Sequence, residues 1–372
     1  MSTKHIIKFY PVGNGDNVLV KLNDDTTVII DCQIRDEIEK NGIKVYDVKR
    51  DILKEIARDS NNNPFVDLFI SSHPHNDHCQ GFEKNYYCGS PSEYSSLNRE
   101  KGEIIIGELW VTERIFSNDL CESAKAIRSE AKRRRKIFNA NFSESQRFGN
   151  RLKIIGYNED DNKTKDLHYV PGNLVSFNPC LSIFVHAPFK KDLVRGKADQ
   201  DHNATSIVLQ MQFFMNHEIK SRLFLAGDAD HYVFEQIIEQ SKNHYNADKL
   251  EWDIFLAPHH CSWSFFNDRP YAENVEPKDY SLEFLDYRKP GAHVIASSRK
   301  IEDKEPNPPH YPAKQKFCQE VGETKFKNTA IHINEKAPQP LVYYIDETGF
   351  TLSKNTSTAA ATILTNPTPR AG

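Results

Sequence analysis

The sequence predicts an α/β protein in which two β-sheets pack face to face and helices cover their outer surfaces. Segments with the alternating or continuous apolar pattern of strands recur along both halves of the chain, and amphipathic helical segments separate them. Hydrophobic residues make up 38% of the 372 residues, so the chain can bury a core and is not a disordered protein. No period of 20–50 residues repeats, which excludes solenoids and propellers.

Short apolar or β-branched runs bounded by turn residues predict the strands. They are expected over residues 5–12, 18–22, 27–31, 66–71, 103–112, 181–187, 205–214, 222–226, 252–257, 293–296, 329–333 and 341–345. Apolar residues at helical spacing predict helices over residues 45–59, 119–139 and 232–241 and from Tyr311 onward, and residues 84–102 are expected to form a polar loop. We expect residues 1–352 to form one domain with a basic helical insertion near 119–150, and residues 353–372 to form a flexible tail.

Charge and cysteine content narrow the classes of function. The net charge is −4, from 48 basic and 52 acidic residues, so a nucleic-acid contact would need a local basic patch. The seven cysteines are odd in number and no Cys-x-x-Cys spacing occurs, which argues against a disulfide framework or a thiolate zinc site. The chain has no apolar run of 18 residues and no signal pattern, so we expect a cytoplasmic protein without membrane contact.

The main chemical signal is the segment His73-Pro-His75-Asn-Asp77-His78, which directly follows a predicted strand. It places four potential metal ligands within six residues. Imidazole and carboxylate groups bind divalent metals such as zinc well, and two metals could share such a cluster. The alternative interpretation is a polar loop that is rich in histidine by chance.

With four further motifs in the same order along the chain, the sequence resembles the metallo-β-lactamase-fold hydrolases. A strand ends at Asp31, His202 lies four residues before Ser206, Asp228 follows Leu-Ala-Gly, and the pair His259 and His260 follows another strand. The resemblance implies a four-layer αββα sandwich of the metallo-β-lactamase type, with the site where the motif loops meet at one edge of the sheets.

Within this superfamily, three segments look nearest to the metallo-β-lactamase domain of bacterial DNA-uptake channel proteins of the ComEC/Rec2 kind. They are residues 12–16 (Val-Gly-Asn-Gly-Asp), residues 203–206 and residues 258–262 (Pro-His-His-Cys-Ser). Three positions depart from the pattern. Gln33 and Cys261 stand where relatives commonly have glycine, and Gln80-Gly81 stands where they usually have two glycines.

The resemblance implies two divalent metal ions, with zinc expected first and manganese or magnesium as alternatives. The first metal would be held by His73, His75 and His202, and the second by Asp77, His78 and His259, with Asp228 bridging both. His260 could replace His259, because the sequence does not distinguish adjacent imidazoles.

Three further roles complete the predicted site. Asp31 would hydrogen-bond a ligand histidine and fix its tautomer. Asp77 and Asp228 would be essential for catalysis as ligands, and His310, in a proline-rich loop, is a candidate general acid. An exposed loop histidine without a role is the alternative for His310.

The reaction implied is hydrolysis by a hydroxide that bridges the two metals, and a phosphodiester in a nucleic acid or nucleotide is the favoured substrate. The run of Lys132, Arg133, Arg134, Arg135 and Lys136 is the candidate substrate-binding surface. The alternative for this run is a solvated helix face. The alternative functions are hydrolysis of a small ester, thioester, lactone or choline-type phosphodiester, and a metal-binding scaffold that serves a protein partner.

Overall fold

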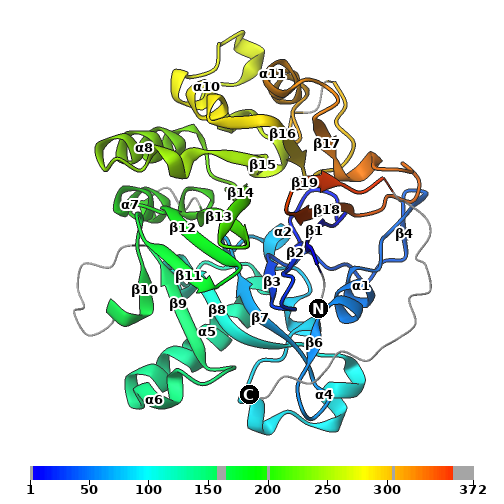
Figure 1. Ribbon diagram of the computed structural model, residues 1–372, viewed down its shortest axis with the longest axis vertical. Helices are drawn as coiled ribbons and strands as arrows, with labels where there is room; N and C mark the ends of the chain where they lie inside the picture. Colours follow the sequence, from blue (N-terminus) through cyan, green and yellow to red (C-terminus); the bar gives the residue numbers. More distant parts are fainter. Residues whose placement is uncertain (1–2, 157–164, 199–201, 304–305, 355–372) are drawn as a thin grey trace.

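Two mixed β-sheets lie face to face, and helices cover the outer face of each (Figure 1). The computed structural model describes residues 3–156, 165–198, 202–303 and 306–354. The predicted tail, apart from residues 353 and 354, therefore lies outside the described residues. The predicted four-layer αββα sandwich is confirmed.

The first sheet has the strand order β10-β9-β8-β7-β3-β2-β1-β18-β19, and β6 pairs with β7 off this path. Its strands are β1 (His5–Phe9), β2 (Val18–Lys21), β3 (Thr27–Ile30), β6 (Ala57–Arg58), β7 (Pro64–Ile70), β8 (Ile105–Thr112), β9 (Arg151–Ile155), β10 (His168–Tyr169), β18 (Leu341–Asp346) and β19 (Gly349–Leu352). Strands β3, β7, β8, β9 and β10 are parallel neighbours, whereas β1, β2, β3, β18 and β19 pair antiparallel, as β6 does with β7. The C-terminal strands thus close onto the N-terminal strand.

The second sheet has the order β11-β12-β13-β14-β15-β16-β17. Its strands are β11 (Leu174–Asn178), β12 (Leu181–Ala187), β13 (Val208–Met215), β14 (Glu218–Leu225), β15 (Trp252–Leu256), β16 (Arg288–Ala296) and β17 (Phe326–Asn328). Strands β11 to β14 pair antiparallel, and β14 to β17 run parallel. A separate hairpin joins β4 (Glu39–Lys40) to β5 (Ile43–Lys44).

The main core lies between the sheets, where alternate strand residues meet. Val28, Ile30, Leu209 and Leu223 belong to this core and are almost fully buried. Because successive strand side chains point to opposite faces, the intervening residues pack under the helices. Ile29, for example, packs in the outer core of the first sheet.

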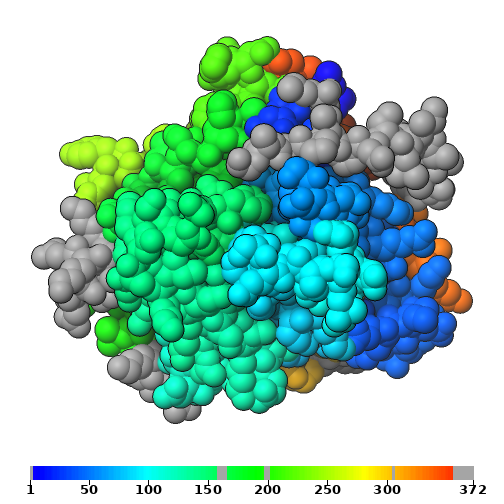
Figure 2. Space-filling view, turned by 90° about the horizontal axis from the view of Figure 1, so that it is seen from below, coloured from blue at the N-terminus to red at the C-terminus, as the bar shows by residue number. Residues whose placement is uncertain are grey.

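Helices cover each outer face through their apolar stripes. On the first sheet lie α1 (Val48–Glu55) and α5 (Glu122–Ala140), and on the second lie α8 (His231–Asn243), α10 (Asp279–Asp286) and α11 (Tyr311–Val321) (Figure 1). The short helix α3 (Phe82–Asn85) also packs on the first sheet. Helix α5 buries Ala124, Ile127 and Ala131, which recur at helical spacing. Seen from below, the segments around α4 (Ser96–Lys101), α5 and α6 (Phe142–Ser145) form much of the surface (Figure 2).

Two secondary-structure predictions were wrong. Residues 84–102, expected to be a loop, contain α4. A capping box begins this helix, because the Ser95 side chain accepts from the Asn98 backbone N–H and the Asn98 side chain accepts from the Ser95 backbone N–H. Residues 329–333 do not form a strand; the last strand of the second sheet is β17, and a 3-10 turn follows it at Thr329–Ile331. Among the described residues, no helix combines the length and apolar character needed to cross a membrane.

Candidate metal centre

Four strand ends bring the predicted ligands to one edge of the two sheets. Strands β3 and β7 are parallel neighbours in the first sheet, and β14 and β15 are parallel neighbours in the second. Asp31 follows β3, the His73–His78 segment follows β7, Asp228 follows β14, and His259 and His260 follow β15. Since the carboxyl ends of parallel strands share one edge of a sheet, residues far apart in sequence converge there.

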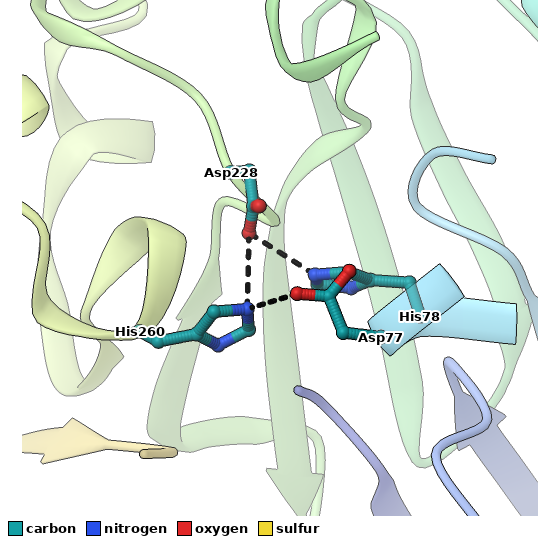
Figure 3. Close-up of side chains that lie close together, drawn as sticks. All are labelled: Asp77, His78, Asp228 and His260. Carbon is teal, nitrogen blue, oxygen red and sulfur yellow. Dashed lines mark hydrogen bonds and ion pairs between the residues drawn. The ribbon is translucent and has the colours of Figure 1, made fainter. Parts of the chain in front are cut away.

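Asp228 lies at the centre of this convergence and faces two groups of side chains. Its Oδ1 atom lies 3.1 Å from His78 Nε2 and 3.8 Å from His260 Nε2 (Figure 3). Its Oδ2 atom lies 3.6 Å from both His73 Nε2 and His259 Nε2. One carboxylate therefore contributes an oxygen to each side of the centre.

Potential ligand atoms form two groups, one on each side of this carboxylate. Within each group, all of these atoms lie within 4.8 Å of one another. One group consists of Asp77, His78, Asp228 and His260, and the other of His73, His75 and Asp228. Asp228 belongs to both groups. Each side thus offers three or four donors to a cation, with Asp228 in the bridging position.

The structure separates the adjacent residues His259 and His260. His260 is buried, and its Nε2 atom lies 3.1 Å from Asp77 Oδ2, on the side that also holds His78 (Figure 3). His259 is partly exposed and contacts the other oxygen of Asp228. The two imidazoles therefore serve different sides of the centre.

The chain in this region is bent by an unusual backbone. His259, His260 and Cys261 have consecutive φ values of 48°, 57° and 71°, in the left-handed region that favours glycine. Such conformations in residues with a side chain cost of order 1–3 kcal/mol each and are found at functional sites. This turn points two successive imidazoles in different directions.

Asp31 lies on the buried side of the centre and accepts hydrogen bonds from two neighbouring residues. Its carboxylate accepts hydrogen bonds from the Ser72 backbone N–H at 2.7 Å, the Ser72 hydroxyl at 2.6 Å and His78 Nδ1 at 2.8 Å. Because Asp31 accepts from Nδ1, the Nε2 atom of His78 is the one that faces Asp228.

Asp16 belongs to the centre but was not among the predicted site residues. It is 4% exposed, and its two oxygens lie 3.9 Å from His78 Nδ1 and 3.8 Å from His260 Nδ1. The preceding Gly15 donates its backbone N–H to His260 Nδ1 at 3.2 Å. The turn at residues 13–16 was the available signal, although a glycine-rich turn alone does not identify a site.

Charge and burial shift the pKa values of these groups strongly. Burial raises the pKa of Asp16 to about 6 in spite of the neighbouring His260 and His78. For His78, burial acts to lower the pKa, but the carboxylates of Asp228 and Asp31 outweigh it and raise the pKa well above its usual value. Burial also acts against ionisation of Asp228, yet His259, His78 and His260 hold its pKa well below the usual range. The buried carboxylates of Asp228 and Asp31 therefore favour positive charge at the position of His78.

The residues fit a divalent metal. Asp228 Oδ1 and His78 Nε2 are buried and have no hydrogen-bond partner, although they lie 3.1 Å apart. A buried polar atom without a partner costs free energy, and a metal ion would satisfy both atoms at once. Imidazole and carboxylate donors in this number match zinc and its neighbours among the divalent metals.

His202 lies beside the cluster rather than within either group of ligand atoms. Its ring is 5.0 Å from that of His75, its Nδ1 atom accepts from Arg114 Nε at 3.1 Å, and its Nε2 atom lies 3.9 Å from Asp119 Oδ2. Arg114 and Asp119 are further residues that the sequence did not indicate. The role of His202 as a ligand stays a prediction.

His310 is held by backbone groups. Its Nδ1 atom accepts from the Trp263 N–H at 2.8 Å, and its Nε2 atom lies 3.3 Å from the Pro306 carbonyl oxygen. These contacts join the proline-rich loop to the chain that follows His260. They give His310 a role in loop structure, and its role as general acid stays a prediction.

The basic run in α5 is largely engaged within the protein. Arg134 is 1% exposed and contacts Glu130 at 2.7 Å, so the expectation that it contacts substrate is wrong: a buried guanidinium cannot reach a phosphate backbone. Arg133 also contacts Glu130, at 2.7 Å, and Arg135 packs 4.5 Å from the centre of the Phe116 ring. Lys132 and Lys136 are exposed. Substrate binding by the other four residues of the run stays a prediction.

Comparison with known proteins gives similarity at the level of structure. No family model matches the sequence, and no curated protein matches it. An isothiocyanate hydrolase from Delia radicum gut bacteria aligns over 91% of this chain and 98% of its own, with 12% identity and a TM-score of 0.42. A possible metal-dependent hydrolase from Veillonella parvula aligns over 88% and 96%, with 11% identity and a TM-score of 0.38.

A long-form RNase Z from yeast aligns over 80% of this chain and 37% of its own, with 11% identity and a TM-score of 0.34. At TM-scores below 0.5 these similarities do not define an activity for this chain. The function of this protein is therefore argued from its own residues, their geometry and their sequence motifs.

Proposed function

We propose that this protein is a metal-dependent hydrolase that holds two divalent metal ions, one on each side of Asp228. Zinc is the metal that we expect. The observation that carries the proposal is the division of the Asp228 carboxylate between two groups of ligands. A scaffold that held one structural metal would not need a shared, fully buried carboxylate. Divalent metals bound there would supply Lewis acidity to a substrate oxygen and lower the pKa of water.

The protein's own residues define a floor and an open side. His73, His78, Asp228 and His260 are buried and form the floor. His75, Asp77 and His259 are partly exposed, with side-chain exposures of 35% for Asp77 and 27% for His259. A substrate would therefore meet the centre at these three residues, while the floor holds the ligands in place.

We propose a phosphodiester, in a nucleic acid or a nucleotide, as the substrate class. The sequence motifs that resemble the DNA-uptake domains favour this substrate, and a centre of two metals suits in-line displacement at phosphorus. Arg114, next to His202, adds a cation beside the cluster.

Metal analysis is the first test. Elemental analysis of protein purified without chelator, and after zinc is added back, should give close to two metals per chain. Asp228→Asn should lose most of both metals, because the residue serves both sides. Asp286→Asn removes a carboxylate whose side chain is 74% exposed and should keep both metals. A metal content near zero in the zinc-treated wild type would refute the proposal.

Activity is the second test. Bis(p-nitrophenyl) phosphate and p-nitrophenyl acetate distinguish a phosphodiester from an ester substrate, and single-stranded DNA, duplex DNA and RNA test the polymer. We expect cleavage of the phosphodiester that Asp77→Ala and Asp228→Asn each reduce by orders of magnitude. If folded Asp77→Ala or Asp228→Asn kept wild-type turnover, the assignment of that residue would be wrong. Cleavage of the acetate alone would replace the phosphodiester by an ester as the substrate class.

A further inference from the structure

A separate cavity of about 370 Å³ lies on the other side of the turn that contacts the metal centre. Gly13 and Asn14 line this cavity, whereas the next two residues, Gly15 and Asp16, face His260. The β4–β5 hairpin, beside α1 in Figure 1, provides a second wall. We refer to this cavity as the Arg35 pocket.

The charged side chains around the Arg35 pocket are mostly basic. Its lining includes the cations Arg35, Lys40, Lys44, Arg299 and Lys300 and the acid Glu335. Glu335 lies 2.8 Å from Lys300, and Glu37 lies 3.7 Å from Lys40. The pocket keeps an excess of positive charge although the whole chain is acidic.

Arg35 is the key residue because its guanidinium is half-buried. Its Nη2 atom lies so close to Gly13 that a Cβ atom there would be 2.6 Å away, so glycine makes room for the guanidinium. Across the described parts of the chain, Arg35 has no hydrogen-bond or ion-pair partner, and Glu37 is the acid whose charge acts on it. A partly desolvated guanidinium without a protein partner is stabilised when an anion pairs with it.

Apolar side chains also line the pocket. Val12 and Val48 are buried, and Pro11, Ile43, Val45 and Pro338 complete this surface. A volume of about 370 Å³ lies within the range of small-molecule sites, which combine an apolar surface with a few polar groups that fix orientation.

We propose that the Arg35 pocket binds a small organic anion. Its phosphate or carboxylate group would lie against Arg35 and Lys44, and its apolar body would lie against Val12 and Ile43. Guanidinium groups bind such oxyanions through two parallel hydrogen bonds. This proposal concerns a binding site beside the metal centre and does not depend on the proposed hydrolysis.

The pocket and the metal centre share one structural element. Asn14 and Asp16 are two positions apart, so their Cα atoms are at most about 7 Å from each other. The Ser297 hydroxyl donates to the Gly15 carbonyl at 2.7 Å, and the Arg299 N–H donates to the Asn14 side chain at 3.0 Å. A ligand in the pocket would therefore contact the turn that supports His260.

Calorimetric titration of the whole protein with phenylphosphonate tests the proposal. Benzyl alcohol serves as the uncharged probe and inorganic phosphate as the anion without an apolar body. We expect saturable binding of phenylphosphonate, weaker binding of inorganic phosphate and none of benzyl alcohol. Arg35→Gln should weaken phenylphosphonate binding about tenfold or more, since hydrogen bonds to charged groups are the strong ones.

Three control variants make the result specific. Arg147→Gln also removes a positive charge, from a side chain that is 74% exposed and lies outside the pocket lining, and should not change the affinity. Lys44→Gln alters an exposed residue, so it should fold normally and weaken binding several-fold. Asp228→Asn should retain binding, which would exclude anion capture by bound metal.

Two outcomes would overturn the proposal. One is the absence of saturable phenylphosphonate binding, and the other is equal affinity in wild type, Arg35→Gln and Lys44→Gln. If phenylphosphonate binds, its inhibition of hydrolysis shows whether the natural anion is a group of the substrate or a separate small molecule. Competitive inhibition of hydrolysis would show that the pocket receives part of the substrate, and any other pattern would show a separate small anion.

Discussion

Replacing Arg134 by methionine should destabilise the fold strongly. The guanidinium is 1% exposed and holds α5 against the first sheet. It donates to Glu130 at 2.7 Å, to the Ile106 carbonyl at 2.8 Å and to the Arg151 carbonyl at 2.8 Å. Methionine keeps a similar length and an apolar stem but removes every donor.

The size of the effect follows from these contacts. Breaking a buried ion pair by removing one partner costs about 3–5 kcal/mol, and a buried carbonyl without a donor costs about 1–3 kcal/mol. Glu130 keeps Arg133 as a partner at 2.7 Å, which reduces the first contribution. We therefore expect the free energy of unfolding to fall by about 3–5 kcal/mol in total.

Urea denaturation monitored by tryptophan fluorescence measures this change, because Trp110 lies on β8 of the same sheet and is fully buried. Arg135→Met is the matched control. Arg135 is 42% exposed and lies 3.7 Å from Glu113, so its removal should cost at most about 1 kcal/mol. Equal stability of Arg134→Met and wild type would refute the structural role of this arginine. Substrate binding by Arg134 would then have to be considered again.

Three further changes test other parts of the structure. Asp31→Asn should weaken metal binding by about 10–100-fold, measured by competition with a chelator, because it removes the charge that orients His78. Burial lowers the pKa of His186 to about 3, so the folded state loses stability as pH falls below the unfolded value of about 6.5. His186→Gln should abolish a loss of about 2 kcal/mol between pH 7 and pH 5, seen in urea denaturation at each pH. Phe234→Ala, at a fully buried ring, should lower the free energy of unfolding by about 3–5 kcal/mol, whereas Tyr232→Ala, at a ring that is 43% exposed, should cost much less.

The sequence by itself determined the layer order and most of the candidate centre. Alternation and helical spacing are local properties, so they placed β12 and most other strands within a few residues of their positions. The His73–His78 segment is also local, because its ligands are neighbours in sequence. Asp228 and Asp31 were proposed through the resemblance of their motifs to the metallo-β-lactamase-fold hydrolases, and Asp31 directly follows β3.

Only the tertiary structure decided the roles of residues that depend on packing. His259 and His260 are adjacent and chemically identical, and the left-handed turn alone sends them to different sides of Asp228. Asp16 joins the centre because its turn folds back against His260.

The same holds for the basic run in α5. In sequence it is a row of equivalent cations, and the docking of the helix on the first sheet decides which one is buried. Arg134 points into the sheet and pairs with Glu130, whereas Lys132 and Lys136 face solvent. Burial depends on the orientation of a helix relative to distant strands, and the local sequence does not contain that information.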